Sequence, residues 1–220
     1  MKPAPFNLLL DTASKDNILV LTSDCSTSCI FCSHLQNPAE VDAYYAGKLS
    51  RDQINILIEF LEAEKKIVIG ESATRICEGE PFIREDIIDI LQSIRLKYSD
   101  TPIQITTSGV HLDEAVLAEL KRIGGIELNV SLNSSSAGGR EKLYRGKAHM
   151  GAVAAVKRLK HYGISYSGSI VAMPHLVGWE DIRETVLFLN GNGASTIRIF
   201  MPGYTRFTKG VLPPWDIRSR

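Results

Sequence analysis

The chain alternates short apolar runs with longer segments in which apolar residues recur every three or four positions. The short runs predict buried strands at residues 17–21, 67–70, 103–109, 126–133, 166–173 and 196–201. The longer segments have helical periodicity and predict helices over residues 49–66, 84–98, 113–123, 150–162 and 179–190. Strands and helices that alternate in this way predict one parallel sheet with right-handed crossovers.

A curved sheet of six such strands, with helices on its outer side, would be an α/β fold of the partial (β/α)6 TIM-like barrel type. Functional residues in parallel sheets of this kind gather at the carboxyl ends of the strands. The polar residues that follow each predicted strand are therefore the first candidates for a site.

Three cysteines follow the first predicted strand directly: Cys25, Cys29 and Cys32. Thiolates at this spacing can bind three irons of a [4Fe–4S] cluster and leave the fourth iron open. They can also bind zinc, with His34 as a fourth ligand, and the spacing alone leaves this alternative open. The remaining thiol, Cys77, is expected to be a buried residue of the second predicted strand, which continues from the apolar run 67–70 toward Glu78.

Further polar residues stand at the ends of the next strands. Glu78-Gly79-Glu80-Pro81 follows the second strand, Ser108 ends the third, and Ser131 and Asn133 end the fourth. Strand alternation places Ser131 and Asn133 on one face. These residue types also occur in ordinary turns and helix starts, so position alone does not separate a site from a turn.

Composition narrows the class of protein. The 220 residues are 44% hydrophobic and 23% charged, as in ordinary globular proteins. Lys plus Arg equals Asp plus Glu, at 25 each, so nucleic acid is an unlikely partner. No apolar run approaches the roughly 18 residues that a membrane span needs, and the N-terminal apolar stretch is too short for a signal peptide. Clustered cysteines without a disulfide pattern favour a reduced, cytoplasmic protein.

The cysteine motif over residues 25–32, with Phe31 before its last cysteine, resembles that of the radical S-adenosylmethionine (radical SAM) superfamily. Glu78-Gly79-Glu80-Pro81 resembles the family's Gly-Gly-Glu-Pro, although Glu78 would be strained if its position required a positive φ. The resemblance covers about residues 18–203. We therefore expect residues 1–220 to form a single radical SAM core domain whose end, residues 204–220, is a tail or a linker.

The resemblance implies a [4Fe–4S] cluster on the three cysteines and SAM bound beside it. The enzyme would cleave SAM reductively, so that a 5′-deoxyadenosyl radical removes hydrogen from a substrate. At positions matching those that contact SAM in the family, this chain has Phe31, Glu80, Ser108, Ser131, Asn133, Arg145, Ile170 and Met201. Arg145 could equally be a solvated surface residue, and the apolar residues could be core.

Three functions remain open from the sequence. An enzyme acting on a small molecule is slightly favoured over one acting on a protein or peptide, such as a glycyl-radical-enzyme activase. A non-catalytic zinc-binding module is the third. A flavodoxin or ferredoxin is implied as the electron donor of either enzyme. Tyr204 and Arg206 are expected to border the open side of the barrel.

Overall fold

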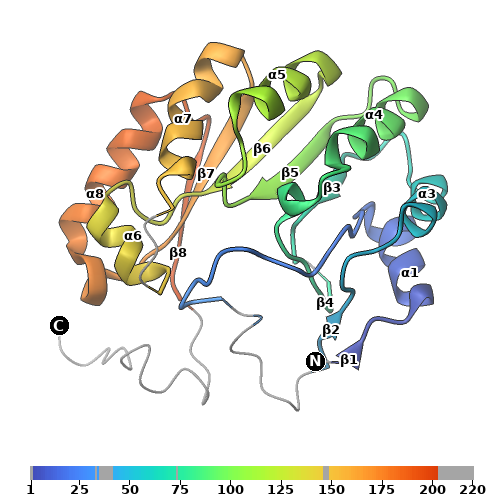
Figure 1. Cartoon of the computed structure of the whole chain (residues 1–220), viewed down its shortest axis with the longest axis horizontal. Helices are drawn as coiled ribbons and strands as arrows, with labels where there is room; N and C mark the ends of the chain where they lie inside the picture. The colour runs from blue at the N-terminus through green and yellow to red at the C-terminus, as the bar shows by residue number, and fades with distance from the viewer. Residues whose placement is uncertain (1, 33, 35–41, 73, 146–148, 203–220) are drawn as a thin grey trace.

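A computed structural model describes residues 2–32, 34, 42–72, 74–145 and 149–202 (Figure 1). Its main sheet has five parallel strands in the order β3-β5-β6-β7-β8. Their bounds are β3 Ile67–Ile69, β5 Ile103–Thr107, β6 Ile126–Ser131, β7 Ser165–Val171 and β8 Ile197–Phe200. The segment expected as the first strand runs beside β3, where Ile18 forms an isolated parallel bridge with Val68.

Helices cover the outer face of this sheet in an arc (Figure 1). They are α1 Phe6–Asp16, α3 Arg51–Glu59, α4 Ile87–Lys97, α5 Glu114–Ile123, α7 Gly151–Tyr162 and α8 Pro174–Gly191. Helix α3 begins at a capping box formed by Ser50 and Gln53. It ends at Glu59, earlier than the periodicity predicts. Beyond it, the buried Asn17 side chain donates hydrogen bonds to the carbonyls of Glu62 and Lys65, which holds that stretch in a non-helical turn.

The two faces of the main sheet differ in chemistry. Ile103, Ile105, Leu128 and Val130 are buried in the hydrophobic core that packs against the helices. Most of their alternating neighbours on the inner face are polar: Gln104 and Thr106 of β5, Glu127, Asn129 and Ser131 of β6, and Ser165, Ser167 and Ser169 of β7. Hydrophobic packing therefore holds the sheet from outside, and the inner face is left for polar contacts.

Three strands of two residues form a second parallel sheet, in the order β1 (Lys2–Pro3), β2 (Tyr44–Tyr45) and β4 (Ile76–Cys77). The expectation that Cys77 belongs to the second strand of the main sheet is wrong. The chain leaves that sheet after Ile69, at Gly70 with φ +76°, before it reaches β4. Strands of two residues have no periodicity that a sequence pattern could reveal.

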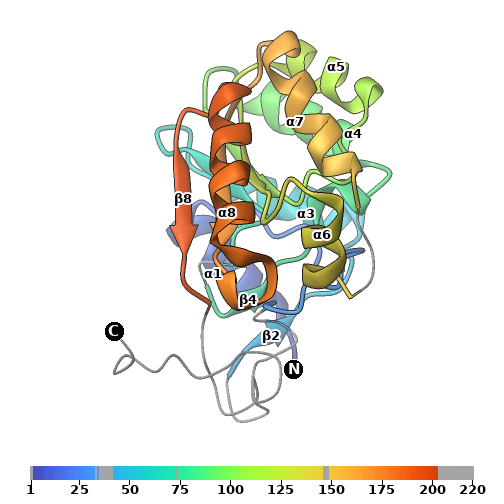
Figure 2. The same ribbon diagram turned by 90° about the vertical axis from the view of Figure 1, so that its left-hand side faces the viewer.

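Helix α6 (Ala137–Leu143) occupies a segment between the predicted strand 126–133 and the predicted helix 150–162, where the sequence pattern predicts no helix. Ser136 caps it by accepting a hydrogen bond from the amide of Gly139. The Ser134 and Ser136 hydroxyls both donate to Asp181 of α8, and Figure 2 shows the two helices side by side at that end. Tertiary contacts thus stabilise a helix whose own sequence contains two glycines.

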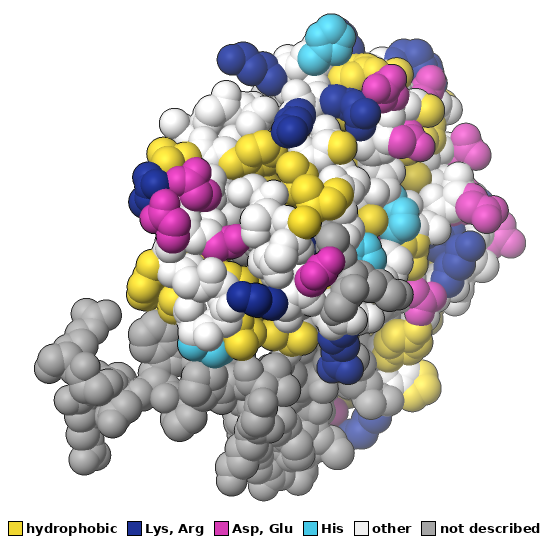
Figure 3. All heavy atoms as spheres, turned by 60° about the vertical axis from the view of Figure 1, so that its left-hand side comes forward, with side chains coloured by type: hydrophobic (Ala, Val, Ile, Leu, Met, Phe, Trp, Pro, Cys, Tyr) yellow, Lys and Arg dark blue, Asp and Glu magenta, His cyan; other side chains and the backbone are white. Residues whose placement is uncertain are grey.

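The described surface fits the balanced composition. On the face shown in Figure 3, basic and acidic side chains are scattered among hydrophobic ones without a patch of one sign. In the described part of the chain, every helix is too short or too polar to cross a bilayer.

Candidate active site

A cavity of about 310 Å³ lies at the carboxyl ends of β3, β5, β6 and β7. The three motif cysteines and the Glu-Gly-Glu segment border it together. Its lining comprises Cys25, Thr27, Cys29, Phe31, Cys32, His34, Gly70, Glu78, Gly79, Glu80, Thr106, Thr107, Ser108, Ser131, Asn133, Tyr144 and Val171. Segments far apart in sequence therefore meet at the sheet edge that the topology indicates.

The three cysteines form one side of the cavity. The thiols of Cys25 and Cys29 lie 3.1 and 3.6 Å from the Thr27 hydroxyl, and the amide of Cys32 donates to the carbonyl of Cys29 in a tight turn. Burial raises the pKa of the Cys29 thiol to about 12. Without a metal this thiol keeps its proton, so its use as a ligand would be coupled to proton release.

Helix α6 supports the cysteine loop. The amide of Ile30 donates to the carbonyl of Leu143 at 3.0 Å. The ring of Phe31 meets the edge of the Tyr144 ring, with 6.3 Å between their centroids. The loop is therefore fixed against the end of a helix, and Phe31 lies on the cavity wall.

The Glu-Gly-Glu segment is aligned with the chain that leads into the cysteines. The amide of Gly79 donates to the carbonyl of Thr22 at 2.8 Å, and the amide of Glu80 donates to the carbonyl of Asp24 at 2.9 Å. A side chain at Gly79 would collide with the Asp24 backbone, so the segments can approach only because this residue is glycine. This approach brings both motifs to one cavity.

Glu80 is 3% exposed, and both its oxygens have partners. Its Oε1 accepts from the Thr107 hydroxyl at 2.7 Å and from the amide of Phe82 at 3.2 Å. Its Oε2 accepts from the amide of Ser108 at 2.6 Å. Glu80 thus borders the cavity and also ties the Glu-Gly-Glu segment to the end of β5.

Glu78 is a site residue whose importance the sequence argument missed. It is 6% exposed, and its Oε2 accepts from the amide of Gly70 at 2.8 Å. Its Oε1 has no hydrogen-bond partner among the described residues. Burial raises the pKa of this carboxyl to about 8, and the nearby Glu71 adds to the rise. The strain considered for this position is absent, because Glu78 is not among the described non-glycine residues with positive φ.

Ser131 and Asn133 both line the cavity, from the end of β6. The Ser131 and Ser169 hydroxyls are 3.1 Å apart. The Asn133 amide donates to the Tyr144 hydroxyl at 3.0 Å, and its Oδ1 accepts from the amide of Val171 at 2.7 Å. Burial raises the pKa of Tyr144, so its hydroxyl remains neutral and polar within this wall.

The other predicted SAM contacts differ in whether they line the cavity. Ser108 lines the cavity. Arg145 is exposed at a positive φ of 51°, just after α6, and Met201 is 55% exposed after β8. Ile170 is fully buried in the hydrophobic core, because alternation turns it away from its neighbour Val171, which lines the cavity. Their contacts with SAM stay predictions, and Tyr204 and Arg206 lie outside the described residues.

Comparison with known families identifies the family to which these motifs belong. Residues 19–189 match the sequence model of the radical SAM superfamily. The chain belongs to the radical SAM superfamily. Among curated relatives of this radical SAM protein, GTP 3′,8-cyclase of Lactiplantibacillus plantarum is 34% identical over 131 residues, which are 58% of this chain and 36% of that protein.

A probable GTP 3′,8-cyclase of Aeropyrum pernix is 29% identical over 166 residues, which are 72% of this chain and 43% of that protein. The radical SAM chain thus spans less than half the length of these two relatives.

Solved structures confirm the predicted fold of the radical SAM chain, a partial TIM-like barrel. SuiB of Streptococcus suis, in a structure bound to S-adenosylmethionine, superposes with a TM-score of 0.63 at 18% identity. The match covers 87% of this chain and 42% of that one. Methylornithine synthase superposes with a TM-score of 0.57, also at 18% identity, over 90% of this chain and 58% of that one.

Radical SAM proteins use a [4Fe–4S] cluster and SAM, and the donor set of this cavity fits both groups. The three cysteines line it together with Glu78 and Glu80, and Glu78 Oε1 is buried without a hydrogen-bond partner among the described residues. Within the described residues, no three His, Cys, Asp or Glu side chains lie close enough together to bind one metal ion. A cluster places irons and sulfides between its cysteines, so it suits more widely spaced thiols than one zinc ion does. His34, considered as a zinc ligand, shares a hydrogen bond with Ser72.

Proposed function

We propose that this radical SAM protein binds a [4Fe–4S] cluster through Cys25, Cys29 and Cys32, binds SAM in the adjoining cavity, and removes a hydrogen atom from a small polar molecule. The observation that carries the proposal is the meeting of the three thiols and four strand ends around one cavity. When bound and reduced, the cluster and SAM together supply a 5′-deoxyadenosyl radical. An electron from a flavodoxin or ferredoxin would be needed for each cleavage.

Residues of the cavity wall divide into two groups. Polar groups of Glu80, Ser108, Ser131 and Asn133 offer hydrogen bonds to the polar parts of SAM. Phe31, Tyr144 and Val171 form an apolar stretch of wall between the cysteine loop and β7. Such a wall would exclude water and so protect a reactive radical from side reactions.

The inner face of the sheet supports a polar substrate. A line of hydrogen bonds crosses four strands there. The Asn129 amide donates to the Thr106 hydroxyl at 3.2 Å, the Ser167 hydroxyl donates to Asn129 Oδ1 at 3.3 Å, and Arg198 Nη2 donates to Ser167 at 3.4 Å. A (β/α)8 barrel is ordinarily filled here by branched apolar side chains. Polar groups in their place favour a hydrophilic occupant.

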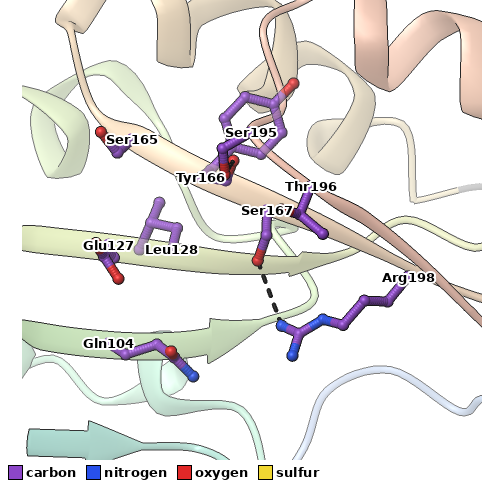
Figure 4. Close-up of a pocket in the computed structure, with 9 residues that line it drawn as sticks. All are labelled: Gln104, Glu127, Leu128, Ser165, Tyr166, Ser167, Ser195, Thr196 and Arg198. Carbon is purple, nitrogen blue, oxygen red and sulfur yellow. Dashed lines mark hydrogen bonds between the residues drawn. The ribbon is translucent and has the colours of Figure 1, made fainter. Parts of the chain in front are cut away.

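This polar face contains a second hollow of about 370 Å³, near the amino-terminal ends of the strands (Figure 4). Figure 4 shows Gln104, Ser167 and Arg198, from three different strands, directed toward it. Arg198 adds a positive charge that could bind an anionic group. GTP is the first substrate to test, because curated relatives are named GTP 3′,8-cyclases.

The cluster and SAM cleavage are tested by reconstituting the protein anaerobically with iron and sulfide, then adding dithionite and SAM. We expect a brown protein with about four irons per chain and formation of 5′-deoxyadenosine. A colourless protein that binds one zinc and makes no 5′-deoxyadenosine would refute the proposal. Product formation stimulated by a peptide but by no nucleotide would leave the radical chemistry in place and reassign the substrate.

Cysteine variants make this experiment specific. Replacing Cys25, Cys29 or Cys32 by Ala should abolish the cluster, because each supplies one of three thiolates. Cys77→Ala is the matched control, since Cys77 is buried in β4 of the second sheet and does not line the cavity. Loss of the cluster in Cys77→Ala alone would show that the thiols have been assigned wrongly.

A further inference from the structure

The hydroxyl of Thr27 lies close to two of the three motif cysteines. Its Oγ1 is 3.1 Å from Cys25 Sγ and 3.6 Å from Cys29 Sγ, and both distances are within the range of a hydrogen bond to sulfur. Thr27 also lines two hollows, the cysteine cavity and a second one of about 310 Å³ that Asp24 and Tyr45 border. One hydroxyl group is therefore shared by two residues that would bind a cluster.

Cluster binding determines which of these groups donates. In the metal-free protein either a thiol or the hydroxyl can supply the hydrogen, since both are donors and acceptors. A cysteine that binds iron is a thiolate, so its sulfur has no proton to donate. The hydroxyl of Thr27 then holds the one remaining hydrogen among these three side chains. Thr27 becomes a donor, and the two sulfurs become acceptors.

We propose that Thr27 donates a hydrogen bond to the ligating sulfurs of Cys25 and Cys29 and thereby makes the cluster easier to reduce. The inference rests on the proposed function, since it needs the cluster to be bound by the three cysteines. Reduction adds one electron, from the flavodoxin or ferredoxin donor, and makes the cluster sulfurs more negative. A hydrogen bond to a more negative acceptor is stronger, so it stabilises the reduced state more than the oxidised one.

The charges around the cysteine loop oppose reduction of a cluster bound there. Asp24 and Glu80 contribute acidic side chains to the linings of the two hollows. Among the described residues, neither lining contains a lysine or an arginine. His34 belongs to both linings, but burial lowers its pKa, so it supplies no positive charge at neutral pH. Nearby acidic groups therefore disfavour an added electron, and the hydroxyl of Thr27 partly offsets that repulsion.

The neighbouring hydroxyl groups of the loop are placed differently. Ser26 Oγ lies 2.6 Å from Nε2 of His111, which follows β5. In the part of the chain that the structure describes, the Ser28 hydroxyl forms no hydrogen bond with a cysteine sulfur. Thr27 is also β-branched, which restricts rotation of its side chain, so little freedom is lost when its hydroxyl is held against the sulfurs. The loop thus provides its own comparison between two adjacent hydroxyl groups.

An EPR-monitored redox titration of the anaerobically reconstituted protein measures the midpoint potential of the cluster. Thr27→Val keeps the shape of the side chain and removes the donor. We expect the equilibrium constant for reduction to fall about tenfold, which for one electron lowers the midpoint potential by about 59 mV. Thr27→Ser keeps the hydroxyl, so its equilibrium constant should stay within about twofold of the wild type.

Ser28→Ala is the matched control, because it removes a hydroxyl from the same loop without removing a donor to sulfur. Its equilibrium constant for reduction should stay within about twofold of the wild type. Iron content per chain shows whether each variant carries the cluster. If Thr27→Val does not hold the cluster, Thr27→Ala replaces it in the same titration. Loss of the cluster in both, with Thr27→Ser loaded normally, would assign the hydroxyl to folding of the loop and overturn its role in reduction.

The outcomes separate the proposed function from the role of Thr27. A wild-type protein that binds no cluster would refute the proposed function itself. A wild type that carries the cluster, with a Thr27→Val variant of equal midpoint potential, would overturn only the role of Thr27. An equal fall in Ser28→Ala would also overturn it, because the shift would not depend on the donor to sulfur. A fall in Thr27→Val that Thr27→Ser reverses would support the assignment.

Discussion

A Cβ atom added to Gly79 would lie 1.9 Å from the carbonyl oxygen of Asp24. No side chain tolerates such a distance, so the Glu-Gly-Glu segment and the chain entering the cysteine loop are packed backbone to backbone. Two hydrogen bonds, from the amides of Gly79 and Glu80 to the carbonyls of Thr22 and Asp24, form across this contact. The cavity depends on it, because one segment carries the cysteines and the other carries both carboxyl groups.

Gly79→Ala should therefore damage both stability and the site. The methyl group must push the two segments apart, and overpacking of this kind costs about 1–3 kcal/mol or more. Urea denaturation should show the lower free energy of unfolding, and anaerobic reconstitution should yield less iron per chain. Gly138→Ala is the control, since a Cβ at Gly138 meets no atom within 4 Å and the residue lies inside α6. We expect that variant to be neutral or slightly more stable.

Thr107→Val tests the hydrogen bond that holds Glu80 at the end of β5. The substitution keeps the side-chain shape but removes the hydroxyl that donates to Glu80 Oε1 within the protein interior. We expect the free energy of unfolding to fall by about 1–3 kcal/mol, because Glu80 Oε1 loses one of its two donors and the amide of Gly109, which donates to the same hydroxyl at 3.0 Å, loses its acceptor. Thr107→Ser keeps the hydroxyl donor, so it should recover the part of the lost stability that comes from the hydrogen bond. It still lacks the methyl group of Thr107. A Thr107→Val variant as stable as the wild type would contradict this role.

The buried carboxyl of Glu78 should make the stability of the metal-free protein depend on pH. Its pKa rises from 4.5 to about 8 on folding, so the folded state keeps a proton that the unfolded state has lost. Below pH 4.5 the carboxyl is protonated in both states, so its burial without a charge does not lower the free energy of unfolding. As the pH rises from 4.5 toward 8, ionisation favours the unfolded state and the free energy of unfolding declines. At 1.36 kcal/mol per pKa unit the decline is about 3–5 kcal/mol in all.

The measurement is the difference in unfolding free energy between wild type and Glu78→Gln, followed from pH 4.5 to 8. Glutamine does not ionise, so the variant should lack this decline and gain on the wild type as pH rises. A difference that stays constant across the range would show that the Glu78 carboxyl titrates normally in the folded protein.

Arg198→Ala tests the polar hollow at the amino-terminal ends of the strands. If GTP binds there through its phosphates, removing the guanidinium should weaken GTP binding at least about tenfold, as expected for a charge-assisted contact. SAM affinity and iron content should not change, because Arg198 does not line the cysteine cavity. Arg198→Lys keeps the charge and should retain part of the affinity. Equal GTP affinities for wild type and Arg198→Ala would remove this hollow from substrate binding.

The periodic elements were predictable because their burial is one-sided. Strands β5, β6 and β7 and helices α4, α5 and α7 lie within a few residues of the predicted bounds. The second sheet was missed because each of its strands has only two residues, and hydrogen bonds between distant segments define it. Helix α6 was missed for a related reason. It depends on a cap at Ser136 and on contacts with Asp181, and neither has a local periodic signal.

The site was predictable to the level of motifs. Cys25, Cys29, Cys32, Glu80, Ser108, Ser131, Asn133 and Phe31 all reach one cavity, because each follows a strand or stands in a recognisable motif. Ile170 could have been placed in the core by counting alternation from Val171. The free oxygen of Glu78 could not have been foreseen. It results from the turn at Gly70, which supplies one donor to the carboxyl group and leaves the other oxygen without one.

The separation of chemistry between the two faces of the main sheet has a consequence for how such a protein diverges. Ile105 and Leu128 on the outer face hold the helices, whereas Thr106 and Asn129, their immediate neighbours in sequence, face the hollow side. Inner-face positions can therefore mutate to suit a new ligand at little cost in folding free energy, while outer-face positions conserve the scaffold. A laboratory library restricted to the inner face should yield mostly folded proteins, which makes this barrel a practical starting point for altered specificity.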